Sequence, residues 1–187
     1  MKKPCGLSLI EILLALSLIA LLLIGFTSSN FTRIHQSTAI NSSMKRLVGA
    51  IALARVTAIS EGKTVTFCRS NDGMNCQGKW HDGSIVFTDR NADRKINEDD
   101  RLIYSFQGLN NRGELSFNSF QNKQYLQMTS RGMTNYQSGN FTFCPANKDP
   151  KLIRQIVINQ IGRTRFARDT DGDGIVEDSR GKPISCD

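Results

Sequence analysis

A cluster of basic side chains near the carboxyl terminus is the part of this 187-residue chain whose composition best suggests chemistry. Between residues 148 and 168, six basic residues accompany a single acid, Asp149. The basic residues are Lys148, Lys151, Arg154, Arg163, Arg165 and Arg168. The fork-shaped donor set of arginine suits phosphate oxygens better than the point charge of lysine. The cluster therefore predicts a site for a polyanion.

The centre of the cluster is the tetrapeptide Gly162-Arg163-Thr164-Arg165, which follows the strand-like residues Ile156 to Ile158. In an extended chain, residues two apart point the same way at a distance of about 6.6 Å. Arg163 and Arg165 are therefore expected to project as a pair, with Thr164 pointing elsewhere. Gly162 permits the tight or left-handed turn that would lift them from a sheet. The alternative is an ordinary solvated turn, because short basic motifs have many false positives.

Net charge supports an anionic partner without identifying it. The chain carries a formal charge of +7. Removing Lys2 and Lys3 leaves +5, and also setting aside Glu11, which we expect to be buried in a membrane, leaves +6. A basic exported domain suits nucleic acid, a lipid surface or an acidic polysaccharide.

The stretch after the basic cluster resembles the opening of a calcium-binding loop. Asp169, Asp171 and Asp173 alternate with small or polar residues, as in that motif. The twelfth position, which requires a bidentate Glu, is Arg180. We therefore expect Asx-type turns in a solvated loop, and these three aspartates are only a weak calcium candidate.

Other metal and catalytic patterns are incomplete as well. A second acidic loop runs from Asp89 to Asp100 but has Arg94 where a calcium loop requires glycine. The only histidines, His35 and His81, fit neither a metal-ligand nor a nucleophile pattern. We expect no metal, no cofactor and no enzymatic activity.

The apolar amino-terminal segment is the element expected to anchor this chain in a membrane. Sixteen of the twenty residues from Leu7 to Phe26 are apolar, and Glu11 is the only charge. A helix of that length spans roughly 30 Å, the thickness of a bilayer core. The sequence predicts a membrane-spanning helix, in which an ionisable residue is functional by default.

The residues before this segment resemble the type III signal of type IV prepilins. A short basic leader, residues 1–6, ends at Gly6, and Glu11 is the fifth residue after it. The resemblance implies that prepilin peptidase cuts between Gly6 and Leu7, that the new amino terminus is methylated, and that Glu11 pairs with the terminal amine of a neighbouring pilin. Leu7 departs from the usual Phe. An ordinary secretory signal would have a small-residue cleavage site after its apolar core, and none is obvious after Phe26.

The cysteines agree with export. Cys5 lies in the leader, and Lys2 and Lys3 place the amino terminus in the cytoplasm, so the remainder faces an oxidising space. Four cysteines allow three pairings. We favour the pairs Cys68–Cys76 and Cys144–Cys186, and regard a zinc site as the weaker alternative.

The rest of the chain predicts an α+β fold. Apolar residues from Ile40 to Ala58 recur at three- and four-residue steps, so the helix is expected to continue from Leu7 to Glu61 and to stop at Gly62. Residues 62–187 alternate in the manner of antiparallel strands. The strands are expected at 65–69, 84–88, 102–106, 114–118, 125–128, 140–143, 152–158 and 163–167.

The start of this β-rich region resembles the head of the FimT/GspH family of minor pilins and pseudopilins. The resemblance rests on residues 66–73, Cys76, Trp80, Asp82-Gly83 and the strand residues 85–87. It implies a type IV pilin fold, in which a long amino-terminal helix packs on an antiparallel sheet. Trp80 and Phe87 are expected to be core residues.

The same resemblance implies a ligand for the basic cluster. FimT-type minor pilins of naturally competent bacteria carry a similar GRxR motif that contacts DNA. The resemblance implies non-specific binding of double-stranded DNA during DNA uptake in natural transformation. It also implies a head in the periplasm on an inner-membrane anchor. After assembly, the subunit would lie in a surface pilus beside other major and minor pilins. The alternative is a structural minor pilin or GspH-like pseudopilin that primes or caps pilus or pseudopilus assembly without binding DNA.

Overall fold

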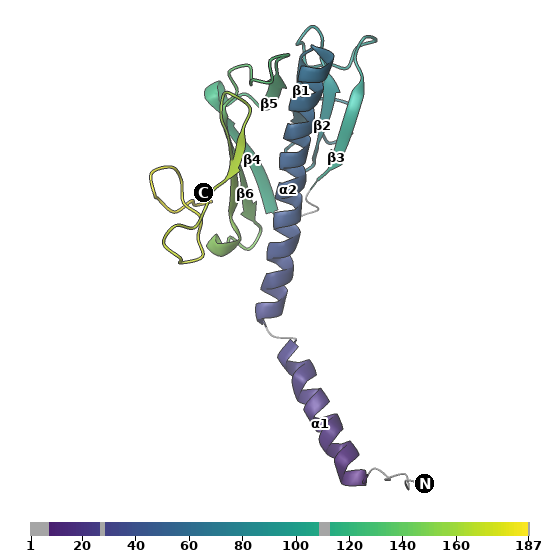
Figure 1. The fold of residues 1–187 in the computed structure, drawn as a ribbon, viewed down its shortest axis with the longest axis vertical. Helices are drawn as coiled ribbons and strands as arrows, with labels where there is room; N and C mark the ends of the chain where they lie inside the picture. Colours follow the sequence, from purple (N-terminus) through teal and green to yellow (C-terminus); the bar gives the residue numbers. More distant parts are fainter. Residues whose placement is uncertain (1–7, 27–28, 109–112, 187) are drawn as a thin grey trace, which may run out of the picture. The chain divides into compact units, whose positions relative to one another are not determined.

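The computed structural model describes residues 8–26, 29–108 and 113–186. The chain divides into two compact units, residues 1–39 and 40–187. Helix α1 is Leu9–Phe26 and helix α2 is Ser29–Glu61 (Figure 1). The predicted end of the helix at Glu61 is confirmed, and Gly62 follows it with a φ of 65°. The helix was expected to continue without a break from residue 7, and residues 7, 27 and 28 of that segment lie outside the described residues.

The amino-terminal unit contains the expected apolar helix. Glu11 lies in the first turn of α1 and is exposed in the single chain. Among the described residues, neither helix has the combination of length and hydropathy that a membrane crossing requires. The predicted leader, residues 1–6, and Leu7, the expected first residue after the cut, lie outside the described residues.

Eight strands form two four-stranded antiparallel sheets within residues 40–187 as described. They are β1 (Val65–Arg69), β2 (Gly83–Thr88), β3 (Leu102–Gln107), β4 (Gly113–Ser119), β5 (Tyr125–Met128), β6 (Gly139–Pro145), β7 (Arg154–Ile158) and β8 (Thr164–Phe166). The first sheet has the order β3-β2-β1-β5 and the second β4-β6-β7-β8. The predicted α+β pilin fold is confirmed.

One predicted strand begins later than expected. We expected it at Leu152, but Pro150–Leu152 form the short 3-10 helix η2, and β7 begins at Arg154. Proline at the first position and the Asp149 carboxylate, which accepts a hydrogen bond from the Lys151 amide at 3.0 Å, favour this turn.

The core lies between α2 and the two sheets. Met44, Leu47, Ile51, Ala54 and Ala58 form the predicted helical stripe and are buried with residues of both sheets. This stripe fixes the position of both sheets on one helix, which is what brings their loops together.

The aromatic residues behave as the sequence analysis expects. Trp80 is 2% exposed, and its ring centroid lies 5.2 Å from that of Phe67 and 5.0 Å from that of Phe141. Phe87 is buried in a second cluster with Cys68 and Ile85. Both residues therefore belong to the core.

Both expected disulfides are present. Cys68 is joined to Cys76, and Cys144 to Cys186. The second bond fastens the carboxyl-terminal tail, whose Val176 and Ile184 pack with Ile153.

The two disulfides are expected to contribute unequally to stability. A bond that closes 42 residues restricts the unfolded chain more than one that closes eight. In the loop-entropy model, Cys144→Ser with Cys186→Ser should lower the free energy of unfolding by about 4 kcal/mol, and Cys68→Ser with Cys76→Ser by about 2.5 kcal/mol. Urea unfolding of the full-length chain in mild detergent measures both. An equal or reversed order would contradict this account of the tail.

Candidate functional site

The tetrapeptide that begins at Gly162 lies at the turn between β7 and β8. The Gly162 amide donates to the Asn159 carbonyl at 3.0 Å, and the Asn159 amide donates to the Arg163 carbonyl at 3.1 Å. The Asn159 side-chain oxygen also accepts from the Arg163 amide at 2.9 Å. Gly162 has a φ of 73°, the left-handed conformation that the sequence analysis allowed for. These three hydrogen bonds lie within the turn and close it.

Gly162 is buried because the turn rests on two other segments. A Cβ atom at this position would lie 2.6 Å from the Gly132 carbonyl oxygen and 3.3 Å from Cδ of Arg55. Arg55, on α2, donates from Nε to that same carbonyl at 2.9 Å. The Thr134 amide also donates to the Gln160 carbonyl at 2.9 Å. The β7–β8 turn, the loop after β5 and helix α2 are therefore packed into one unit.

The two arginines of the motif are exposed beside this packed turn. Arg165 pairs in register with Val157, and Thr164 with the buried Ile158. Because strand side chains alternate, Arg165 lies on the outward face and Thr164 on the inward one. Strand β8 is an edge of its sheet among the described residues, so Arg163 and Arg165 border open solvent.

Three other members of the basic cluster lie towards the opposite end of β7. Arg168, Lys151 and Lys148 are all exposed. The Ala167 amide donates to the Gln155 carbonyl at 2.9 Å, so the chain stays extended beyond β8. At about 3.3 Å per residue, Arg163 and Arg168 lie roughly 16 Å apart. We call these exposed basic residues the row: Arg163, Arg165 and Arg168 follow the edge strand β8, and Lys148 and Lys151 lie in the connection before β7.

Arg154 does not belong to this row. Its Nε donates to Oδ1 of Asn41 on α2 at 2.8 Å, and its Nη1 donates to the Lys151 and Ile153 carbonyls at 2.9 and 2.8 Å. Burial lowers the pKa of this guanidinium. Arg154 was expected among the phosphate-binding residues, but it lies where it joins the sheet to helix α2.

Arg131 is a residue that the sequence analysis missed. It is exposed and precedes Gly132, the residue whose carbonyl lies against Gly162. Gly132 and Gly162 share a φ of 73°. A glycine next to an arginine in a left-handed turn therefore occurs twice, and the fold brings the two turns together. The sequence contains both pairs, but their contact depends on the tertiary structure.

The acidic loop lies next to the lysine end of the row. One ligand atom from each of Asp169, Asp171, Asp173 and Glu177 lies within 4.8 Å of the others. The buried Glu177, which the sequence analysis missed, accepts from the amide and hydroxyl of Thr170, each at 2.8 Å.

Backbone donors account for much of this loop's geometry. The Gly172 amide donates to the Asp169 carboxylate at 2.7 Å, an Asx-type contact of the kind expected. This bond, followed by others from the same loop, holds the pKa of Asp169 below its usual value although desolvation raises it. A Cβ on Gly174 would lie 3.2 Å from Cδ of Lys151, so these negative charges are next to Lys151. These charges reduce the attraction of an anion to Lys151.

A long amino-terminal helix packed on antiparallel sheets defines the chain as a type IV pilin-like protein. A family model described as Type II transport protein GspH matches residues 43–162, and the chain belongs to that family. It is a GspH/FimT-like minor type IV pilin. The search of curated proteins gives no match.

Solved structures of minor pilins share the fold. The type IV minor pilin FimU of Pseudomonas aeruginosa matches in one crystal form with a TM-score of 0.56 and 20% identity, over 83% of this chain and 98% of FimU. A second crystal form gives 0.53 and 18%, over 78% and 98%. The minor pseudopilin EpsH of Vibrio cholerae gives 0.49 and 13%, over 67% and 94%.

We expect a substitution at Gly162 to lower the free energy of unfolding through a steric contact as well as through the backbone angle. Gly181 has the same φ of 73° but open space around its Cα, so Gly181→Ala is a matched control. We expect Gly181→Ala to lower the free energy of unfolding by about 1 kcal/mol, and Gly162→Ala by more than about 2 kcal/mol because its Cβ also meets a backbone carbonyl. Urea unfolding curves measure the difference. Equal losses would mean that the turn is not held against Gly132.

Proposed function

We propose that this minor pilin binds DNA non-specifically through the turn formed by Gly162, Arg163, Thr164 and Arg165, during DNA uptake in natural transformation. The observation that carries the proposal is the pair of exposed arginines on an edge strand, beside a glycine turn packed against α2. Among the described residues, neither arginine forms an ion pair with a carboxylate. Both guanidinium groups are therefore available to phosphate oxygens.

The mode of binding follows from the residues of the row. Phosphate contacts fix a protein on DNA but carry no sequence information, so binding is expected to be independent of sequence. Arg168, Lys148, Lys151 and the newly identified Arg131 would add weaker contacts around the motif. With four or five phosphates neutralised, the logarithm of affinity should fall with the logarithm of salt concentration with a slope of about −3.6 to −4.5.

The rigidity of the turn favours this use. A side chain on a mobile loop loses conformational entropy when it is ordered by a ligand. The Gly162 turn is already fixed by Arg55 and by the Gly132 carbonyl, so only the arginine side chains remain to be ordered. This preorganisation partly offsets the small number of contacts.

A second candidate role is structural, and the family membership favours it. In this role the subunit primes or caps a pilus or type II pseudopilus without binding DNA. We propose that prepilin peptidase cuts between Gly6 and Leu7, that α1 anchors the subunit in the inner membrane with a periplasmic head, and that the assembled subunit lies in a surface pilus. Glu11 would then pair with the terminal amine of a neighbouring pilin. The two roles are compatible because they use opposite ends of the chain sequence.

The DNA-binding role predicts a specific loss in Arg163→Gln with Arg165→Gln. Two lost phosphate contacts should weaken binding of a 12-base-pair duplex about thirtyfold and reduce the salt slope by about 1.8. Fluorescence anisotropy of the full-length chain in detergent measures both. Arg90→Gln with Lys95→Gln removes the same charge from the exposed loop after β2 and serves as the control. If the two double variants weaken binding equally, only net charge matters and the assignment to this turn is wrong.

The assembly role predicts a separate effect of Glu11→Gln. Removing the charge should lower the amount of subunit recovered in sheared filaments several-fold, because the pairing with a neighbouring amine is lost. Affinity of the purified chain for duplex DNA should stay within twofold of the wild type. Immunoblots of sheared filaments and anisotropy provide the two readouts. Unchanged recovery would refute the role of Glu11.

A further inference from the structure

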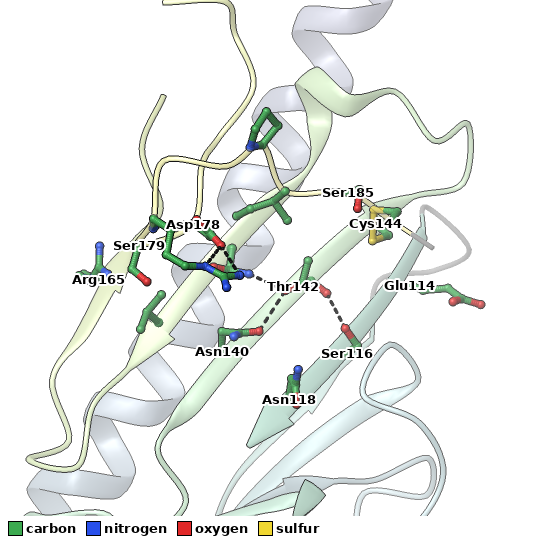
Figure 2. Close-up of a pocket in the computed structure, with 16 residues that line it drawn as sticks. Glu114, Ser116, Asn118, Asn140, Thr142, Cys144, Arg165, Asp178, Ser179 and Ser185 are labelled. Atoms are coloured by element: carbon green, nitrogen blue, oxygen red, sulfur yellow. Dashed lines mark hydrogen bonds and ion pairs between the residues drawn. A yellow bond between two sulfur atoms is a disulfide. The ribbon is translucent and has the colours of Figure 1, made fainter. Parts of the chain in front are cut away.

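The outward face of the second sheet is an open groove of about 730 Å³ (Figure 2). Its floor is formed by outward side chains of β4, β6 and β7, and one wall by the carboxyl-terminal tail. The floor residues are Glu114, Ser116, Asn118, Asn140, Thr142, Gln155 and Val157. The tail residues Asp178 to Cys186 are held there by the disulfide to Cys144. The disulfide therefore keeps the end of the tail beside the sheet.

The outward residues of β6 and β7 on this floor carry no charge, whereas β4 contributes the carboxylate of Glu114 at one end. Nε2 of Gln155 donates to the Thr142 hydroxyl at 3.0 Å, and that hydroxyl donates to Oδ1 of Asn140 at 3.3 Å. These bonds leave the Asn140 amide nitrogen as a donor and Oε1 of Gln155 as an acceptor. Neither atom has a hydrogen-bond partner among the described residues. The Asn140 donor and the Gln155 acceptor therefore lie on the same floor. Because neighbouring strands are about 4.8 Å apart, the two groups are close enough for one nucleotide to reach both.

The groove is continuous with the DNA site proposed above. Arg165 lines it and lies opposite Val157 in the β7–β8 register. A nucleic-acid strand whose phosphate is bound by Arg165 therefore has its neighbouring nucleotides over the amide floor. Phe120 directly follows β4 and is 61% exposed, and its amide donates to the Ser138 carbonyl at 3.2 Å, two residues before Asn140. Phe120 is not one of the residues that line the groove, but its exposed ring follows β4 at the Asn118 and Asn140 end, where a nucleotide extending beyond the groove could stack on it.

We infer that this groove binds unpaired nucleotides, so that the site prefers single-stranded DNA to duplex of the same length. This inference rests on the proposed DNA-binding role. Unpaired bases expose Watson–Crick edges with donors and acceptors that the Asn140 and Gln155 amides can meet, whereas in a duplex those edges are occupied. Each amide carries both a donor and an acceptor, so the groove tolerates different bases.

The test compares one 12-nucleotide single strand with the corresponding duplex, using anisotropy of the full-length chain in detergent. The wild type should bind the single strand more tightly. Asn140→Ala with Gln155→Ala should weaken single-strand binding about tenfold and change duplex binding less than twofold. Gln107→Ala, an exposed amide on β3 of the other sheet, is the control and should change neither.

The outcomes separate this inference from the proposed function. If duplex and single strand both fail to bind, the DNA-binding role is refuted and the inference with it. If duplex binding depends on Arg163 and Arg165 but the single strand binds no more tightly and is insensitive to Asn140 and Gln155, the inference alone is overturned. Unchanged duplex affinity in the amide variant also serves as the check that the variant is folded.

Discussion

The head depends on the burial of one helical stripe against two sheets. Met44, Leu47, Ile51 and Ala54 of α2 are 3% exposed or less, and they contact residues of both sheets. Each sheet buries its inward apolar side chains in one core with this helix. Because both pack on the same helix, loops far apart in the sequence meet at fixed positions. Arg55, one residue beyond the stripe residue Ala54, reaches the loop after β5 and holds it against the β7–β8 turn.

This packing places the basic residues of the cluster in different environments. Of the six basic residues between 148 and 168, Arg154 is used inside the fold and Lys151 lies next to the acidic loop. Arg163 and Arg165 remain exposed at a rigid edge. Although the cluster looks uniform in the sequence, an anion is therefore expected to bind most favourably at the end with Arg163 and Arg165. The same edge continues into a polar groove, which is why its ligand is expected to be a strand with exposed bases as well as phosphates.

The sequence determined much of this because local patterns carry it. The helical stripe, the strands and the left-handed Gly162 follow from periodicity and from the properties of glycine. The roles of Arg154 and Arg131 could not be predicted in this way. Arg154 is hydrogen-bonded to Asn41, more than one hundred residues earlier, and Arg131 is next to Gly162 only because two turns pack together. Glu177 likewise joins the aspartates through the fold of the tail. In each case the deciding contact is between residues distant in the sequence.

The most direct test of the central claim is to map the amide chemical shifts of the chain as a short duplex is added. The account predicts salt-sensitive changes at Gln160 to Arg168, with smaller changes at Ser130 to Met133, and none around the remote basic residues Arg69 and Lys123. Changes centred on those remote residues, or none at all in dilute buffer, would contradict it.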